Sequence, residues 1–213
     1  MIFRHSIIVF VTLLIGGIVN FGSISIFSRL LSPLEYGAFS LATATVALVI
    51  AFLFQWILHG FMRFIPQKSA ENNKIYLTNF LTILASVSVG VLLLVAVFYA
   101  LNQIIGQVSL RSISVWVWVL VPAIAIFETI FNVMSHYTRL VRENIYLFAL
   151  ATICRSFLYI GLGYFLIQAG YSYIGLLIAL MLSFLLPSII LWFCNADRRT
   201  LSSKDVQLSL IHI

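Results

Sequence analysis

Long apolar segments alternate with short polar ones along almost the whole chain. The apolar segments lie at about 7–27, 38–59, 76–101, 115–137, 145–167 and 173–193. Because an α-helix rises about 1.5 Å per residue, a segment of ~20 apolar residues is long enough to cross the ~30 Å hydrocarbon layer of a bilayer. The pattern therefore predicts an all-α integral membrane protein with six transmembrane helices.

The composition agrees with this class. Hydrophobic residues make up 62% of the chain and charged residues 8%, and the mean hydropathy is +1.12. In a soluble protein the net charge of +6 would suggest a nucleic-acid partner. Here the charges are confined to the short segments between apolar ones, so we expect the lipid bilayer as the partner and no nucleic acid. The two cysteines, Cys154 and Cys194, have neither disulfide nor metal-site spacing.

The positive charges favour one orientation. If the N-terminus lies in the cytoplasm, nine lysines and arginines flank the cytoplasmic ends of the segments and two flank the outer ends. The nine are Arg4, Arg63, Lys68, Lys74, Arg139, Arg142, Arg198, Arg199 and Lys204, and the two are Arg29 and Arg111. This asymmetry predicts that the N-terminus and the chain from residue 195 onward are cytoplasmic. The first segment is longer than the core of a typical signal peptide, so we expect an uncleaved helix.

The end of the chain differs from the rest. Residues 195–207 are polar and predict a cytoplasmic tail, whereas the hexapeptide 208–213 is apolar again. This hexapeptide resembles the translation of an adaptor used in sequencing libraries. We therefore expect 208–213 to be non-native and the chain to be an N-terminal fragment, which a native stop codon after Ile213 would contradict.

Two formal charges lie deep inside apolar segments, Glu128 in the fourth and Arg155 in the fifth. The short basic turn at 138–144 makes these segments antiparallel neighbours. Counted from that turn, both charges lie about 14 to 15 Å into their helices, close to the middle of the hydrocarbon layer. An unpaired charge at this depth costs at least about 2.5 to 3.5 kcal/mol, so we expect both side chains to face each other, a wet cavity or a ligand.

Polar side chains accompany both charges at helical spacing. Asn132 follows Glu128 by one turn, and Thr152 and Tyr159 flank Arg155. The first stripe continues with Ser135, His136 and Arg139. Three interpretations are open: a buried Glu128–Arg155 ion pair that holds the hairpin together, an anion-binding or coupling site, and a contact with missing parts of the chain.

A third set of small and polar residues lies in the first apolar segment. Gly16, Asn20 and Ser23 share one helical face. This face is either a close contact with another helix, in which Asn20 finds a partner, or part of a pore lining.

Motifs of catalysis are missing from the sequence. It has no Gly-x-Ser-x-Gly elbow, no phosphate-binding glycine loop followed by Lys-Ser or Lys-Thr, and no His-Glu-x-x-His metal helix. We therefore expect a protein that is not an enzyme, with no catalytic residues, no metal and no cofactor.

Residues 27–39, Phe-Ser-Arg-Leu-Leu-Ser-Pro-Leu-Glu-Tyr-Gly-Ala-Phe, carry a resemblance to a known family. After a first span they resemble the first external loop of polysaccharide-biosynthesis flippases, within the multidrug/oligosaccharidyl-lipid/polysaccharide exporter superfamily. The run 63–66, Arg-Phe-Ile-Pro, and the Arg139 and Arg142 turn are similar to what that family has. The resemblance extends up to the polar tail and corresponds to the N-terminal half of the family's architecture.

The resemblance implies a fold and a substrate. The fold is one lobe of a two-lobed transporter that works by alternating access in the cytoplasmic (inner) membrane of a bacterium. The substrate is an undecaprenyl-pyrophosphate-linked oligosaccharide, flipped for the assembly of O-antigen lipopolysaccharide, capsule or exopolysaccharide. Polysaccharide polymerase machinery is a further implied partner.

The resemblance also implies roles for the polar residues. Arg155 would attract the pyrophosphate or an acidic sugar, and Glu128 would hold Arg155 in place or take up a proton. Hydrogen bonds to sugar hydroxyls would come from Asn20, Asn132, Thr152 and Tyr159. Two rivals remain: a multidrug exporter of the same superfamily, and a six-span membrane scaffold or assembly subunit in which the charge pair is structural.

Overall fold

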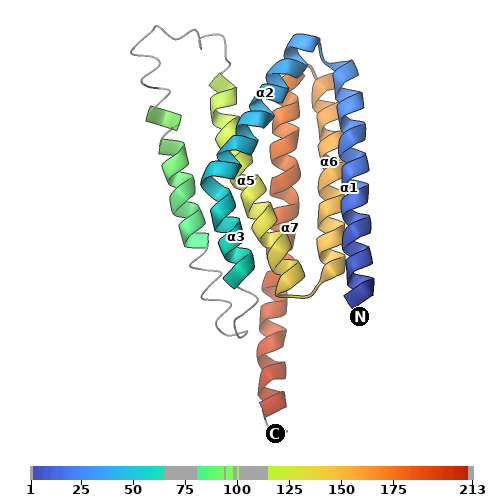
Figure 1. Ribbon diagram of the computed structural model, residues 1–213, viewed down its shortest axis with the longest axis vertical. Helices are drawn as coiled ribbons and strands as arrows, with labels where there is room; N and C mark the ends of the chain where they lie inside the picture. Colours follow the sequence, from blue (N-terminus) through green and yellow to red (C-terminus); the bar gives the residue numbers. More distant parts are fainter. Residues whose placement is uncertain (1, 65–80, 94, 98–99, 101–114, 211–213) are drawn as a thin grey trace.

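A computed structural model describes residues 2–64, 81–93, 95–97, 100 and 115–210 (Figure 1). All regular structure in these ranges is helical. Five helices are long and apolar enough to cross a membrane, and a shorter apolar helix covers Leu81–Val97. The chain is therefore an all-α, multi-pass membrane protein, as the apolar pattern predicts. Part of the predicted third span, 76–101, lies outside the described residues.

Helices α1 (Ile2–Leu30) and α6 (Ile145–Gln168) lie side by side at one edge of the bundle (Figure 1). Their contact is close at Gly163 of α6, where the missing side chain leaves room for the ring of Phe27 of α1. The ring of Phe27 packs edge-on against Tyr159, with 5.4 Å between ring centroids, and it also lies against Gly163. The opposite face of α1 is exposed, with Phe10 and Phe21 among its large side chains.

Helix α2 (Pro33–Val49) begins five residues before the predicted span at 38–59, because the turn before it contains a complete capping box. Ser32 is the N-cap, Pro33 occupies the first helical position, and Glu35 returns its carboxylate to the Ser32 backbone. Serine at the N-cap with glutamate three residues later satisfies amide groups that a helix start leaves open. The residues expected to form an external loop therefore divide between α1 and α2.

A single helical rod continues from α2 through a π-helical turn, η1 (Ile50–Phe54), into α3 (Gln55–Phe64). The rod packs against α5 (Val115–Leu140). In α3, Leu58 and Phe61 form a small apolar cluster with Val133 and Tyr137 of α5. This contact fixes the second predicted span against the fourth.

Helix α7 (Ser172–Leu210) packs against both α5 and α6, and more extensively than those two pack against each other. The fourth and fifth predicted spans do form an antiparallel hairpin, but the sixth span supplies much of the surface that each of them buries. Leu176, Leu177 and Leu191 on α7 are fully buried in the main core. The helix also extends through 195–210, where the sequence predicted only a polar tail after the span at 173–193.

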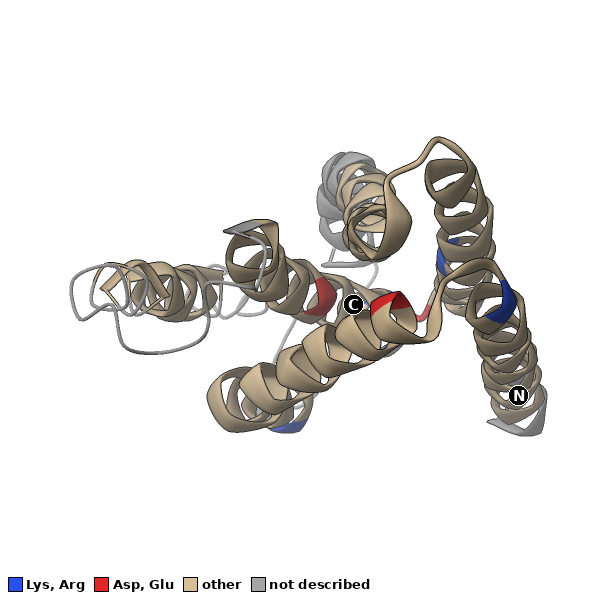
Figure 2. Ribbon diagram, turned by 90° about the horizontal axis from the view of Figure 1, so that it is seen from above, with Lys and Arg blue, Asp and Glu red and all other residues tan. Residues whose placement is uncertain are grey.

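The two chain ends lie at the same end of the bundle (Figure 1). We call this the terminal end; it includes the turn 141–144 between α5 and α6. The opposite end, which we call the capped end, includes the turns 31–32 and 169–171 (Figure 1). Charged positions are few along the described helices when the bundle is viewed from above (Figure 2).

Candidate functional site

Arg155 lies in the middle of α6, and its guanidinium group is held between two aromatic rings. The carbon Cζ lies 4.9 Å from the ring centroid of Phe184 on α7 and 5.7 Å from that of Phe131 on α5. A cation over an aromatic face is attracted by the ring quadrupole, and the attraction is stronger when water is excluded. Three helices therefore position this one charge.

Glu128 lies on α5, one turn before Phe131, and it is close enough to Arg155 for the two charges to attract each other. No salt bridge joins the two side chains in the described structure. One interpretation of the sequence was a direct Glu128–Arg155 ion pair that holds the hairpin together. The described structure does not contain that ion pair. The opposite charges therefore interact without a direct bridge, and Arg155 Nε remains without a hydrogen-bond partner.

Buried polar atoms without a partner are concentrated on α5, α6 and the turn between them. Within the described residues they are Ser135 Oγ, Arg139 Nε, Arg142 Nε and Arg155 Nε. Nearly all buried polar atoms in proteins have a hydrogen-bond partner, and an exception calls for a ligand, an ion or water. Arg155 thus offers a buried, directional donor to an acceptor such as a phosphate oxygen.

The remaining predicted residues of this site have different surroundings. Thr152 donates its hydroxyl to the Phe148 carbonyl of its own helix at 2.9 Å. Tyr159 turns its ring to Phe27 of α1, and Asn132 is half-buried on α5. Asn132 therefore lies on the same stripe of α5 as Glu128 and Ser135, whereas Tyr159 takes part in the contact between α1 and α6.

Asn20 is separate from this group. Its side chain is exposed on α1, while Gly16 and Ser23 are buried. Gly16 lies beside Ser156 of α6, and Ser23 donates to the Asn20 carbonyl at 2.6 Å. The predicted helix contact is thus made at Gly16, Ser23 is buried on the same face, and the exposed Asn20 does not take part in the contact. The prediction that Asn20 acts with Arg155 at one site finds no support in this arrangement.

Sequence reasoning missed the two phenylalanines that hold Arg155. Phe131 had a weak signal, since it lies one turn after Glu128 in a segment expected to face the fifth span. Phe184 had none, because a single apolar span does not indicate which neighbour its side chains meet.

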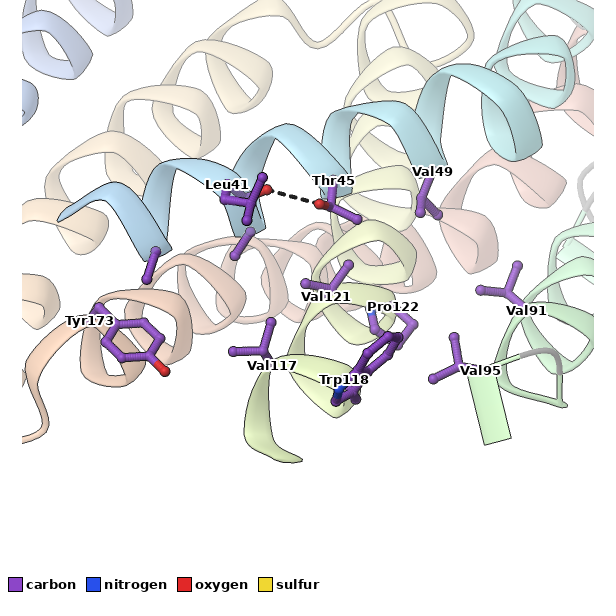
Figure 3. A pocket seen from close by; sticks show the side chains of 12 residues that line it. Leu41, Thr45, Val49, Val91, Val95, Val117, Trp118, Val121, Pro122 and Tyr173 are labelled. Carbon is purple, nitrogen blue, oxygen red and sulfur yellow. Dashed lines mark hydrogen bonds between the residues drawn. The ribbon is translucent and has the colours of Figure 1, made fainter. Parts of the chain in front are cut away.

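An apolar cavity of about 290 Å³ lies nearer the capped end, between α2, α5, α7 and the helix at Leu81–Val97 (Figure 3). It is lined by Ala38, Leu41, Ala42, Thr45, Val49, Val91, Val95, Val117, Trp118, Val121, Pro122 and Tyr173. The Thr45 hydroxyl donates to the Leu41 carbonyl at 2.8 Å, so it presents little free polarity to the cavity (Figure 3). An apolar group is the ligand that such a lining accepts best.

No group of three or more His, Cys, Asp or Glu side chains within the described ranges is arranged to hold a metal ion. Comparisons of the chain with protein-family models, with curated proteins and with solved structures found no significant match.

Proposed function

We propose that this chain is the N-terminal lobe of a transporter that moves an undecaprenyl-pyrophosphate-linked oligosaccharide across the bacterial cytoplasmic membrane by alternating access. The observation that carries the proposal is the half-buried Arg155 midway along a candidate span, whose buried Nε has no partner in the described structure. The family resemblance of residues 27–39 supplies the substrate class.

The physical reason is the cost of a buried charge. An arginine at mid-membrane is costly, and the described residues provide ring faces and a nearby carboxylate but no direct ion bridge. A pyrophosphate group would supply both the opposite charge and acceptor oxygens, and the planar guanidinium suits phosphate geometry. Substrate binding would thus recover part of that cost.

Glu128 completes the proposed site as a counter-charge. While the site is empty, Glu128 is the opposite charge that attracts Arg155. When an anion binds, Glu128 and the anion compete for the same cation. This competition gives a physical route by which substrate shifts the balance between two conformations, since a ligand shifts an equilibrium only through its differential affinity.

The test replaces Arg155 in cells whose only copy of the native gene carries the change. We expect Arg155→Ala to lower surface glycan export by about 10- to 100-fold, the loss typical of one charge-assisted hydrogen bond, and lipid-linked oligosaccharide to accumulate. Arg155→Lys keeps the charge but not the planar fork and should have an intermediate effect. Leu150→Ala, at an exposed position of α6, is the matched control.

Unchanged glycan export at normal protein levels in both Arg155→Ala and Glu128→Gln would refute the proposal. A second function, export of apolar drugs, is favoured by one specific observation, the apolar cavity beside Trp118 and Val121. Its signature would be dye accumulation in a Val121→Trp variant, which fills the cavity, with normal surface glycan. If glycan and dye are both unaffected by these variants, the six-span scaffold becomes the better explanation.

A further inference from the structure

Two arginines lie where α5 meets the α5–α6 turn, at the terminal end of the bundle: Arg139 in the last turn of α5 and Arg142 three residues after Arg139. Both are half-buried, and both have a buried Nε without a hydrogen-bond partner. They are remote from the proposed transport site, since they lie at the helix end and Arg155 lies mid-helix. The transport proposal does not explain them.

Arg139 extends toward α6. Its Cζ lies 5.3 Å from the ring centroid of Phe148, and its Nη2 is 3.3 Å from Nδ1 of His136. The ring and the imidazole hold the guanidinium plane in place. A guanidinium carries five N–H donors, and the nitrogen of His136 can accept only one of them.

Arg142 extends toward α7. Its Cζ lies 5.9 Å from the ring centroid of Tyr137, and its Nη2 donates to the Asn195 carbonyl at 3.4 Å. The amide of Asn195 in turn donates to Thr138 Oγ1 at 2.9 Å. This network ties the turn to α7 and orders the second guanidinium, but it also uses only one of the five donors.

Carboxylates do not neutralise these two cations in the described part of the chain. The adjacent Glu143 is exposed, and no salt bridge joins it to Arg139 or Arg142. Two positive charges with ordered, incompletely used donors therefore lie where two candidate spans, ending at Leu140 and beginning at Ile145, meet the interface. Phosphate groups of lipids occupy this level of a bilayer, and basic pockets at helix ends bind such headgroups.

We propose that the α5–α6 turn binds the phosphate group of an anionic phospholipid through Arg139 and Arg142. The guanidinium planes, fixed on Phe148 and Tyr137, present donors that match phosphate oxygens. The two side chains approach the headgroup region from the α6 and α7 sides of the turn. A bound lipid anchors this end of the bundle at the membrane surface, and the inference does not depend on the transport function.

The test measures lipid binding by the full chain in detergent, with native mass spectrometry and thermal unfolding as readouts. The probes are phosphatidylglycerol as the anionic lipid, phosphatidylcholine as the zwitterionic lipid, and inorganic phosphate as the free anion. We expect phosphatidylglycerol to bind best. One Lys or Arg near an anionic membrane surface typically strengthens binding about fivefold. Arg139→Gln or Arg142→Gln should therefore weaken phosphatidylglycerol binding about fivefold, and the double change should weaken it about 30-fold.

Arg29→Gln is the matched control, because Arg29 is an exposed cation near the capped end and its loss changes the net charge equally. If the double variant does not fold, the two single variants decide the question. Equal binding of phosphatidylglycerol by wild type and by the arginine variants would overturn the proposal. Inorganic phosphate that binds at millimolar concentration and displaces phosphatidylglycerol would overturn the assignment to a lipid and identify a free-anion site.

Discussion

Polar groups at the capped end of the bundle are bonded to other protein groups, whereas several between α5 and α6 are not. We call the second region, which comprises Ser135, Arg139, Arg142 and Arg155, the seam. At the capped end, Glu35 accepts hydrogen bonds from the Ser32 backbone at 2.9 Å, from the Ser32 hydroxyl at 2.7 Å and from Ser172 of α7. Along the seam, Ser135 Oγ and the Nε atoms of Arg139, Arg142 and Arg155 are buried with no partner.

The difference separates groups that hold the fold from groups that are available to a ligand. A carboxylate whose oxygens are both bonded to the protein has little left to offer. The bonds of Glu35 join the α1–α2 turn to the α6–α7 turn, where Ser172 has a backbone φ of 51° and Gly170 a φ of 89°. Ser172 is thus held in a left-handed conformation that is uncommon for a residue with a side chain.

The capped end and the seam also differ in how closely their side chains pack. Near the capped end, α6 has no spare volume at Gly163, where an added Cβ would lie 2.7 Å from Phe27 Cζ and 2.9 Å from Leu176 Cδ1. Along the seam, the Arg155 guanidinium lies beside the rings of Phe131 and Phe184, and Glu128 is close to it without forming a salt bridge. The capped end is thus closely packed, whereas the seam keeps buried polar atoms without a partner.

The largest expected effect on stability comes from Gly163→Ala. Phe27 and Leu176 are fully buried and cannot move away from the new methyl group, so we expect a loss of about 1 to 3 kcal/mol. Gly161→Ala, two residues away on the same helix and with open space around it, is the control and should be neutral or slightly stabilising. Thermal and denaturant unfolding in detergent measure both. Equal effects of the two substitutions would show that the capped end is not tightly packed.

Ser32→Ala should have the next largest effect. It removes the N-cap of α2 and the hydroxyl contact with Glu35, which typically costs about 1 kcal/mol. Ser40→Ala, at an exposed position of the same helix, serves as the control. If the two variants unfold at the same temperature, the capping box does not contribute to stability and the contrast with the seam becomes weaker.

The smallest effect on stability is expected from Glu128→Gln. The substitution removes an attraction to Arg155, but it also removes the cost of burying the carboxylate, and these two effects oppose each other. We expect a change below about 1 kcal/mol, smaller than that of Ser32→Ala, together with a loss of glycan export. A destabilisation larger than that of Ser32→Ala would mean that the central charge pair holds the fold after all.

Much of the fold could be predicted from the apolar pattern, because the bilayer's thickness sets the length of each span. The pattern also predicted the α5–α6 hairpin, since the turn at 138–144 is too short for any other arrangement. It was wrong about where α2 begins, because the polar residues of a capping box resemble a loop. The predicted span at 173–193 matches the candidate span Ser172–Asn195, and the helix continues to Leu210 through the segment predicted as a polar tail.

The site was only partly predictable. Equal distances from one turn predicted that Glu128 and Arg155 lie at one depth, and the two charges are close enough to attract each other. Asn20 could not be placed, because Gly16, Asn20 and Ser23 share a face broad enough for the first and last to be buried while Asn20 remains exposed.

The sequence by itself determined the class of protein and the approximate positions of its long apolar helices, and it predicted a common depth for the two central charges. These follow from local quantities, namely helical rise, apolar segment length and distance from a turn. Only the tertiary structure decided that α7 packs against both α5 and α6, so that Arg155 meets Phe131 and Phe184 and forms no bridge to Glu128. Inside a membrane every span is apolar, and complementary side-chain shape decides which helices become neighbours.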